Sequence, residues 1–144
     1  MAFFGYRLMI IMPIVLIHVR KHLSAVNVTK IEALSGGAVW LLTETEGAIR
    51  IDTNPEDYSL TSQWYSAQSG QFSATRVFGV YEDLLGNEWI LSDNGLGMLT
   101  AGQTTPTSYF VDAAEREKKG GQAFYSCLEY NSEIYFGSDN GRVW

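Results

Sequence analysis

Several side chains in this sequence belong to types that binding or catalytic sites use. Glu82 and Asp83 are adjacent carboxylates, and glycoside cleavage requires a carboxylate pair. Adjacent residues of a strand point to opposite faces, so these two cannot flank one bond together. Asp93 and Asp139 both occur in Ser-Asp-Asn-Gly. A calcium loop supplies more oxygen ligands at alternating spacing, so this motif indicates turns instead.

Cysteine and histidine give no sign of thiol or metal chemistry. Cys127 is the only cysteine, and it lies in a strand-like run where a small, buried, apolar role is expected. His18 and His22 lie together near the N-terminus, so no zinc cluster is expected. The sequence also contains no phosphate loop and no nucleophile elbow. It therefore predicts a protein that is not an enzyme and carries no metal and no cofactor.

Aromatic side chains are the remaining candidates, because they can serve as stacking platforms for sugars. Three of them lie in apolar runs, at Trp40, Trp89 and Tyr135. Packing in the core is the expected role of these three. Three others lie in more polar segments, at Trp64, Tyr65 and Tyr109. We predict that this second group is exposed at the rim of the fold, where ordinary packing is the favoured role and ligand binding is the alternative.

The first three aromatics belong to a repeated pattern. Residues 37–43 (GAVWLLT) recur as residues 86–92 (GNEWILS), and residues 132–138 (SEIYFGS) are a looser third copy. The aromatic residues of the three copies are 49 and then 46 residues apart. A repeat of this length, rich in short strands, is typical of propeller blades, which are small sheets that cannot bury their faces alone.

Each repeat is expected to form a meander of short strands. The continuous apolar runs at residues 39–42 and 89–91 indicate strands that are buried on both faces. We therefore predict an all-β fold, a partial β-propeller of about three antiparallel blades. The blades are expected at about 26–70, 71–120 and 121–144, with the third truncated. Between the second and third units, residues 112–121 are predicted to form a solvated insertion with one or two helical turns.

Residues 1–25 form a short hydrophobic segment that differs from the rest of the chain. The apolar run at residues 8–19 suits the core of a signal peptide and is too short for a transmembrane helix. Pro13 within the run and the basic pair Arg20-Lys21 after it do not fit a typical signal peptide. Three interpretations stay open: an atypical signal peptide, a strand pair of a preceding blade, and a misassigned gene start.

Composition and charge exclude some classes of partner. The chain is 46% hydrophobic and 13% aromatic, which favours a folded core over disorder. Its net charge is −6, but residues 1–25 hold three of the ten basic residues and none of the 16 acidic ones. The remaining 119 residues therefore carry a net charge of −9. Such an acidic body would repel a phosphate backbone, so nucleic acid is not an expected partner.

Residues 69–96 contain the pairs Glu82-Asp83, Trp89-Ile90 and Gly95-Leu96. These pairs match the E-D pair, the W-I pair and the G-L ending of the two-component regulator propeller repeat, which this segment therefore resembles. Leu42 and Leu91 depart from the pattern, since the family has a small glycine at this position. The signature positions of the three repeats are Gly37, Trp40, Asp83, Gly86, Trp89, Gly95, Tyr135 and Gly141.

This resemblance implies a sensor. Such repeats are typical of hybrid two-component regulators of Gram-negative bacteria, whose periplasmic propellers detect glycan breakdown products and signal through a membrane helix to a kinase. The chain would then be a periplasmic fragment that binds a small glycan. It would pack against the remaining blades or self-associate, and it would reach the membrane only through parts that lie beyond this sequence.

Two alternative functions stay open. One is a glycan-active enzyme on a propeller scaffold, which needs paired carboxylates that meet in one place. The other is a cytoplasmic protein-interaction propeller, which requires that residues 1–25 are folded structure and not an export signal.

Overall fold

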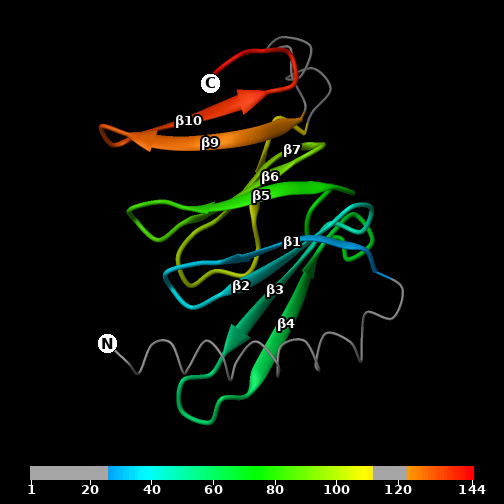
Figure 1. The fold of residues 1–144 in the computed structure, drawn as a ribbon, viewed down its shortest axis with the longest axis vertical. Helices are drawn as coiled ribbons and strands as arrows, with labels where there is room; N and C mark the ends of the chain where they lie inside the picture. The colour runs from blue at the N-terminus through cyan, green and yellow to red at the C-terminus, as the bar shows by residue number, and fades with distance from the viewer. Residues whose placement is uncertain (1–25, 112–122) are drawn as a thin grey trace.

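The computed structural model describes residues 26–111 and 123–144. Within these ranges the chain forms ten strands in three antiparallel sheets, which follow one another in sequence order (Figure 1). The predicted all-β class is confirmed. The N-terminal segment 1–25 and the predicted insertion at residues 112–121 lie outside the described residues, so the hypotheses about them stay predictions. The described part of the chain contains no helix long and apolar enough to cross a membrane.

Sheet 1 is a four-stranded meander. Its strands are β1 (Val28–Ala33), β2 (Val39–Thr43), β3 (Ala48–Thr53) and β4 (Leu60–Tyr65), and each is antiparallel to the next. Central strand β2 is buried from Trp40 to Thr43, as its continuous apolar run predicts. Edge strand β4 is mostly exposed or half-buried, in agreement with its polar sequence.

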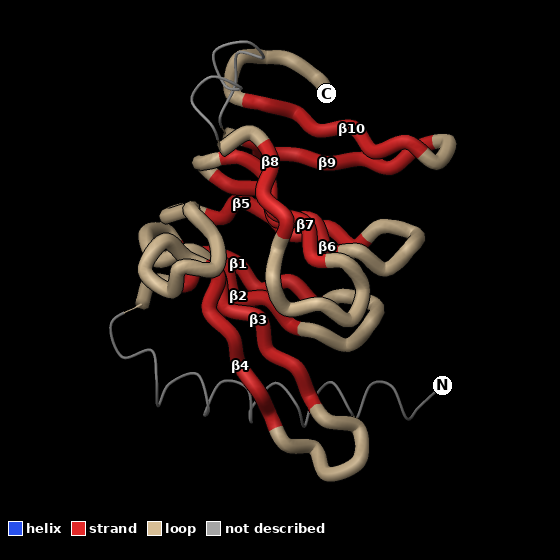
Figure 2. The backbone as a smooth tube through the Cα atoms, turned by 180° about the vertical axis from the view of Figure 1, so that it is seen from behind, coloured by secondary structure: helices blue, strands red, loops and turns tan. Residues whose placement is uncertain are grey.

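Sheet 2 repeats this meander, and sheet 3 begins it again (Figure 2). The strands of sheet 2 are β5 (Val77–Glu82), β6 (Glu88–Ser92), β7 (Gly95–Leu99) and β8 (Thr107–Tyr109). Sheet 3 is the hairpin of β9 (Phe124–Tyr130) and β10 (Glu133–Ser138). After β10 the chain turns back, and the backbones of Phe136 and Trp144 exchange two hydrogen bonds of 3.0 Å.

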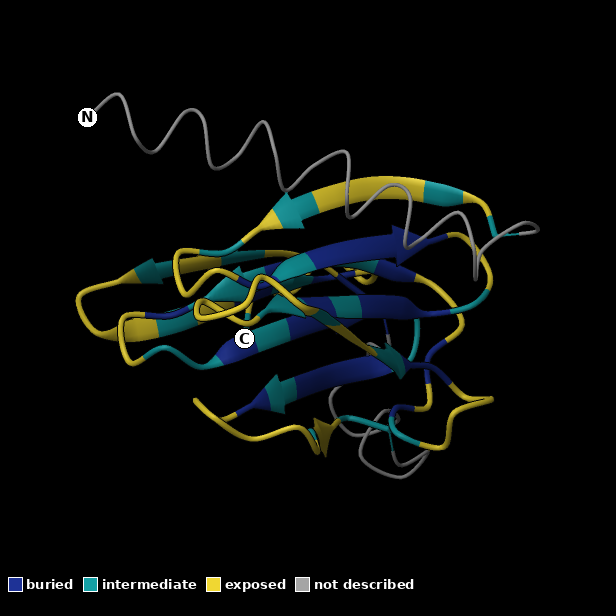
Figure 3. Ribbon diagram, turned by 90° about the horizontal axis from the view of Figure 1, so that it is seen from below, coloured by how far each residue is buried: buried dark blue, intermediate teal, exposed yellow. Residues whose placement is uncertain are grey.

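The sheets are stacked face to face (Figures 1 and 3). Alternate residues of the central strands supply the contacts to the two neighbouring sheets. On β6, Ile90 packs towards sheet 1 and Leu91 towards sheet 3. The core between sheets 1 and 2 contains Trp40, Leu42, Ala48, Tyr65, Phe72, Ala74, Val77, Val80, Ile90 and Leu99. The core between sheets 2 and 3 contains Leu91, Leu96, Phe124 and Phe136. None of the three sheets closes into a barrel.

Sheets 1 and 2 share details beyond their strand order. The tryptophan of the second strand packs on a tyrosine of the fourth strand, with ring centroids 5.0 Å apart for Trp40–Tyr65 and 6.0 Å for Trp89–Tyr109. All four signature glycines, Gly37, Gly86, Gly95 and Gly141, have φ between 73° and 93°. These repeated contacts explain the spacing of the aromatic residues in the sequence.

Candidate functional site

A shallow depression beside β4 contains the predicted candidate Trp64. It has a volume of about 280 Å³ and is lined by Glu46, Trp64, Ser66, Gln68 and Ser69. Trp64 is half-buried, and its inner part packs on a small apolar cluster on the face of sheet 1 that lies away from sheet 2. The depression therefore combines an aromatic side chain with carboxylate, amide and hydroxyl groups.

The wall of this depression is a turn held together by two serines. Ser69 Oγ accepts a hydrogen bond from the Ser66 amide at 3.0 Å and lies 3.1 Å from the Trp64 carbonyl oxygen, to which it donates. Ser66 Oγ in turn accepts a hydrogen bond from the Ser69 amide at 3.1 Å. Serine hydroxyls commonly fix turns in this way. The turn is thus built from local sequence, which leaves Gln68 exposed at the rim.

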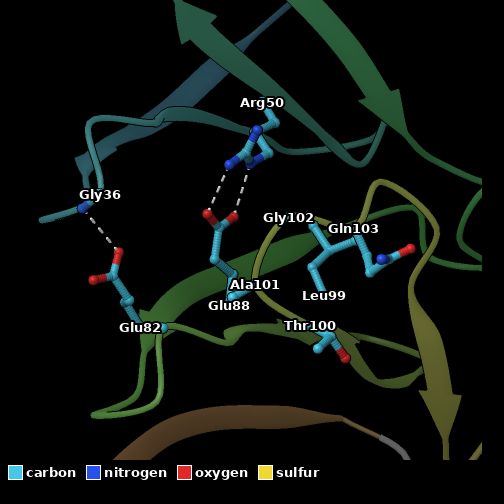
Figure 4. Close-up of a pocket in the computed structure, with 10 residues that line it drawn as sticks. Gly36, Arg50, Glu82, Glu88, Leu99, Thr100, Ala101, Gly102 and Gln103 are labelled. Atoms are coloured by element: carbon cyan, nitrogen blue, oxygen red, sulfur yellow. Dashed lines mark hydrogen bonds and ion pairs between the residues drawn. The ribbon is translucent and has the colours of Figure 1, made fainter.

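A second cavity, the Arg50 cleft, lies between sheets 1 and 2 (Figure 4). Its volume is about 290 Å³, and it is lined by Gly36, Arg50, Glu82, Gly86, Glu88 and residues 99–103. Arg50 on β3 points across the cleft to Glu88 on β6 and binds both carboxylate oxygens at 2.9 Å. Arg50 also pairs with Asp52.

The charged groups of the Arg50 cleft hold the two sheets together. Glu88 also accepts a hydrogen bond from the indole Nε1 of Trp40 at 2.9 Å, so this one carboxylate binds two side chains of the opposite sheet. Its hydrogen bond to Arg50, against the cost of burial, raises the pKa of that guanidinium above its ordinary value. Among the described residues, every buried side-chain nitrogen and oxygen has a hydrogen-bond partner. Because these polar groups already bind one another between the two sheets, the cleft is poorly suited to a ligand.

The structure separates the adjacent carboxylates Glu82 and Asp83. Glu82 accepts hydrogen bonds from Ser35 and from the Gly36 amide in sheet 1, the latter at 3.2 Å. Asp83 instead turns back to its own β5–β6 turn, where Trp89 Nε1 donates to it at 3.0 Å. The prediction that the two cannot act on one bond is therefore confirmed. Glu82 does share a face with Glu88, its partner in the strand register.

The other aromatic candidates do not join Trp64. Tyr65 is completely buried in the core between sheets 1 and 2, so the expectation that it is exposed is wrong. Alternation along β4 turns it away from Trp64 and onto Trp40, and burial raises its pKa to about 12. Tyr109 is 37% exposed on another sheet and packs on Trp89.

The three predicted core aromatics have different environments. Trp40 is completely buried, and Trp89 is half-buried against Phe136, as predicted. Tyr135 is 36% exposed, so the prediction of core packing is wrong for this residue. It occupies the same position in sheet 3 as the two tryptophans in sheets 1 and 2, but the described residues place no sheet over it.

The remaining polar candidates have structural partners. Asp93 lies in the β6–β7 turn, and its carboxylate accepts hydrogen bonds from the Thr75 and Arg76 amides, just before β5, at 3.1 Å. Cys127 packs in the core between sheets 2 and 3, and burial raises its pKa to about 11. The described residues contain no group of three or more histidine, cysteine and acidic side chains that could hold a metal ion.

Comparison with known proteins does not assign a family. No family model matches the chain, and no curated protein matches it significantly. The function is therefore inferred from the fold, the two cavities and the sequence pattern.

Proposed function

We propose that this chain is a ligand-binding, non-catalytic fragment of a β-propeller from the periplasmic sensor region of a hybrid two-component regulator. The ligand is a glycan breakdown product, and the kinase that receives the signal belongs to parts beyond this sequence. In this proposal the three sheets are successive blades, of which the third is incomplete.

The repeated sheet is the observation that carries the proposal. Sheets 1 and 2 have the same strand order, the same tryptophan–tyrosine contact and the same stacking direction. Blades of a propeller are four-stranded antiparallel sheets that follow one another along the chain and pack face to face. The match between this architecture and the sequence pattern at residues 69–96 supports a sensor propeller over an unrelated sandwich.

The Trp64 depression is the favoured place for the ligand. An aromatic ring packs well on the apolar face of a sugar, and nearby carboxylate, amide and hydroxyl groups can bind its hydroxyls. Trp64 offers the ring, and Glu46 and Gln68 lie beside it. The Arg50 cleft is less suitable, because its charged groups already bind one another across the two sheets.

Calorimetric titration of the full chain with a panel of oligosaccharides tests this assignment. Trp64→Ala removes the ring and Gln68→Trp fills the depression, so each should weaken binding at least about tenfold, or about 1.4 kcal/mol. Ala101→Trp fills the Arg50 cleft instead and is the matched control that should leave binding unchanged. Oligosaccharide binding that is lost only in Ala101→Trp would refute the assignment.

One observation favours the enzyme alternative enough to test it. Glu82 and Glu88 share one face and line one cleft, which is the minimum that glycoside cleavage requires. Both are occupied as acceptors of inter-sheet hydrogen bonds, so we expect bound oligosaccharides to remain intact. Products that appear with the full chain and disappear with Glu82→Gln would establish an enzyme.

A further inference from the structure

The outer face of sheet 3 carries exposed apolar side chains. Leu128 is 62% exposed, Tyr130 is 63% exposed and Tyr135 is 36% exposed. Strand alternation and the pairing of Leu128 with Tyr135 place these three on one face, opposite the face that packs on sheet 2. Glu133 lies on the same face and accepts a hydrogen bond from Tyr135. We call these four residues the outer face.

The corresponding faces of sheets 1 and 2 are both covered by the next sheet. Trp40 takes the place of Tyr135 in sheet 1 and packs against sheet 2. Trp89 takes that place in sheet 2 and packs against Phe136 of sheet 3, with ring centroids 5.1 Å apart. The outer face thus continues an interface that the molecule already makes twice.

A second contact recurs at the same interfaces. Glu82, near the end of the first strand of sheet 2, accepts a hydrogen bond from the Gly36 amide in the β1–β2 turn. Glu129, near the end of the first strand of sheet 3, accepts one from the Leu84 amide in the β5–β6 turn at 3.0 Å. In each case a carboxylate reaches back to the first turn of the preceding sheet. The β9–β10 turn is the next turn in this series.

We propose that the outer face is a docking surface for a further antiparallel sheet of the same repeat. The incoming sheet presents apolar side chains over Leu128 and Tyr135, and it carries a carboxylate near the end of its first strand that reaches the β9–β10 turn. This inference rests on the propeller part of the proposed function and is independent of the glycan ligand.

A second copy of this chain fits the outer face less well. The inner faces of sheets 2 and 3, which would match the outer face, already pack on the preceding sheet within each copy. Pairing two outer faces would bury Glu133 of both copies in one apolar contact, which is unfavourable for like charges. A separate sheet of the same design brings an unoccupied inner face and covers only one Glu133.

Extension of the full chain by a second copy of residues 99–144 tests the proposal. Trp144 follows Gly141 as Met98 follows Gly95, so the added residues continue the repeat in register. The extension supplies the missing strands of sheet 3 and then a second β9–β10 hairpin. The inner face of this hairpin is the one that packs on sheet 2 in the original copy, and in the extension it is available to dock on the outer face of sheet 3. A thiol reporter in the original outer face then measures docking. It is made by Leu128→Cys, with Cys127→Ser in both copies.

Thiol labelling at position 128 should slow about tenfold or more in the extended chain, because a docked residue reacts only through local opening. The matched control is Leu85→Cys, which is 82% exposed in the β5–β6 turn and should label equally fast in both chains. Tyr135→Lys in the original copy should restore fast labelling at position 128. Equal labelling rates at position 128 in the extended and unextended chains would overturn the proposal. Slowing that depends on the concentration of the unextended chain would overturn it in favour of self-association.

Discussion

At the scale of single residues, two carboxylates account for much of the order in the turns and between the sheets. Glu88 binds Trp40 and Arg50 across the gap between sheets 1 and 2. Asp83 holds the β5–β6 turn together, since its oxygens accept hydrogen bonds from Asn87, Leu85 and Trp89 at 2.8–3.0 Å. A hydrogen bond to a charged acceptor stabilises more than one between neutral groups. Both carboxylates should therefore contribute measurably to folding.

The Asp83 contribution should depend on pH in a defined direction. Partial burial alone would raise the pKa of Asp83, but hydrogen bonds from Trp89, Asn87 and Leu85 outweigh it and hold the pKa below the ordinary value of 3.8. Its stabilisation is thus complete above pH 3.8 and is lost as the pH falls through the lower, folded-state pKa. Asp83→Asn should cost about 1–3 kcal/mol at neutral pH. Urea unfolding of both proteins should show this difference shrinking below the ordinary aspartate pKa.

The control for Asp83 is Glu56→Gln in the exposed β3–β4 turn, which should change the free energy of unfolding by less than about 0.5 kcal/mol. A difference between the original protein and Asp83→Asn that stays constant down to strongly acidic pH would contradict the assigned role. It would mean that the side-chain charge of Asp83 does not matter to the fold.

Sequence reasoning at this scale succeeds where the cause is local. The separation of Glu82 and Asp83 follows from strand alternation, which needs only two neighbouring residues. The role of Glu88 could not be predicted, because its partners lie 38 and 48 residues away on another sheet. The burial of Tyr65 was missed because its segment is polar, although the side chain itself points inward onto Trp40.

At the scale of elements, the turn after β6 places glycine where backbone from another strand passes closely. Gly95 has a φ of 88°, and a Cβ atom there would lie 2.3 Å from the carbonyl oxygen of Tyr109 on β8. Gly47 repeats this geometry in sheet 1, where a Cβ atom would lie 2.2 Å from the carbonyl oxygen of Tyr65. The glycine therefore permits the fourth strand to end beside the second turn.

Alanine substitution can separate two properties of Gly95, which are its positive φ and its close approach to the carbonyl oxygen of Tyr109. Gly102 has a similar φ of 78° but nothing within 4 Å of a Cβ atom, so it is a matched control for the backbone conformation alone. Gly102→Ala should cost about 1–2 kcal/mol. Gly95→Ala should cost a further 1–3 kcal/mol, on the order of an overpacked site, because the carbonyl of Tyr109 must move. Equal losses in urea unfolding would show that the close approach is unimportant.

The strands themselves were largely predictable. The apolar runs at residues 39–42 and 89–91, which predict buried strands, lie within β2 and β6. Continuous apolar runs and Asp-Asn-Gly turns mark these elements locally. The sequence did not indicate which sheet packs on which face of another sheet, because this depends on which residues of each strand point towards which neighbouring sheet.

At the scale of the whole molecule, the stack is built from nearest-neighbour contacts. Sheet 2 is packed on both faces, whereas sheet 3 has two strands and one face with exposed apolar residues. In such an arrangement, stability is approximately the sum of each unit and its interfaces. The repeat length predicted this layered organisation, but it could not specify that the third anchor, Tyr135, is left exposed.

Stability should therefore decrease from sheet 2 to sheet 3. Truncating one buried side chain in each of the two interfaces tests this. Ile90 is completely buried between sheets 1 and 2, and Ile90→Ala should lower the global free energy of unfolding by about 2–5 kcal/mol. Phe136 is 7% exposed between sheets 2 and 3 and has fewer strands beside it. Phe136→Ala should chiefly accelerate hydrogen exchange in β9 and β10, because the hairpin can open while sheets 1 and 2 stay packed. Exchange measured by mass spectrometry distinguishes these patterns. Equal acceleration of β2 and β10 in Phe136→Ala would show that the three sheets unfold as one unit, contrary to a stack of separable layers.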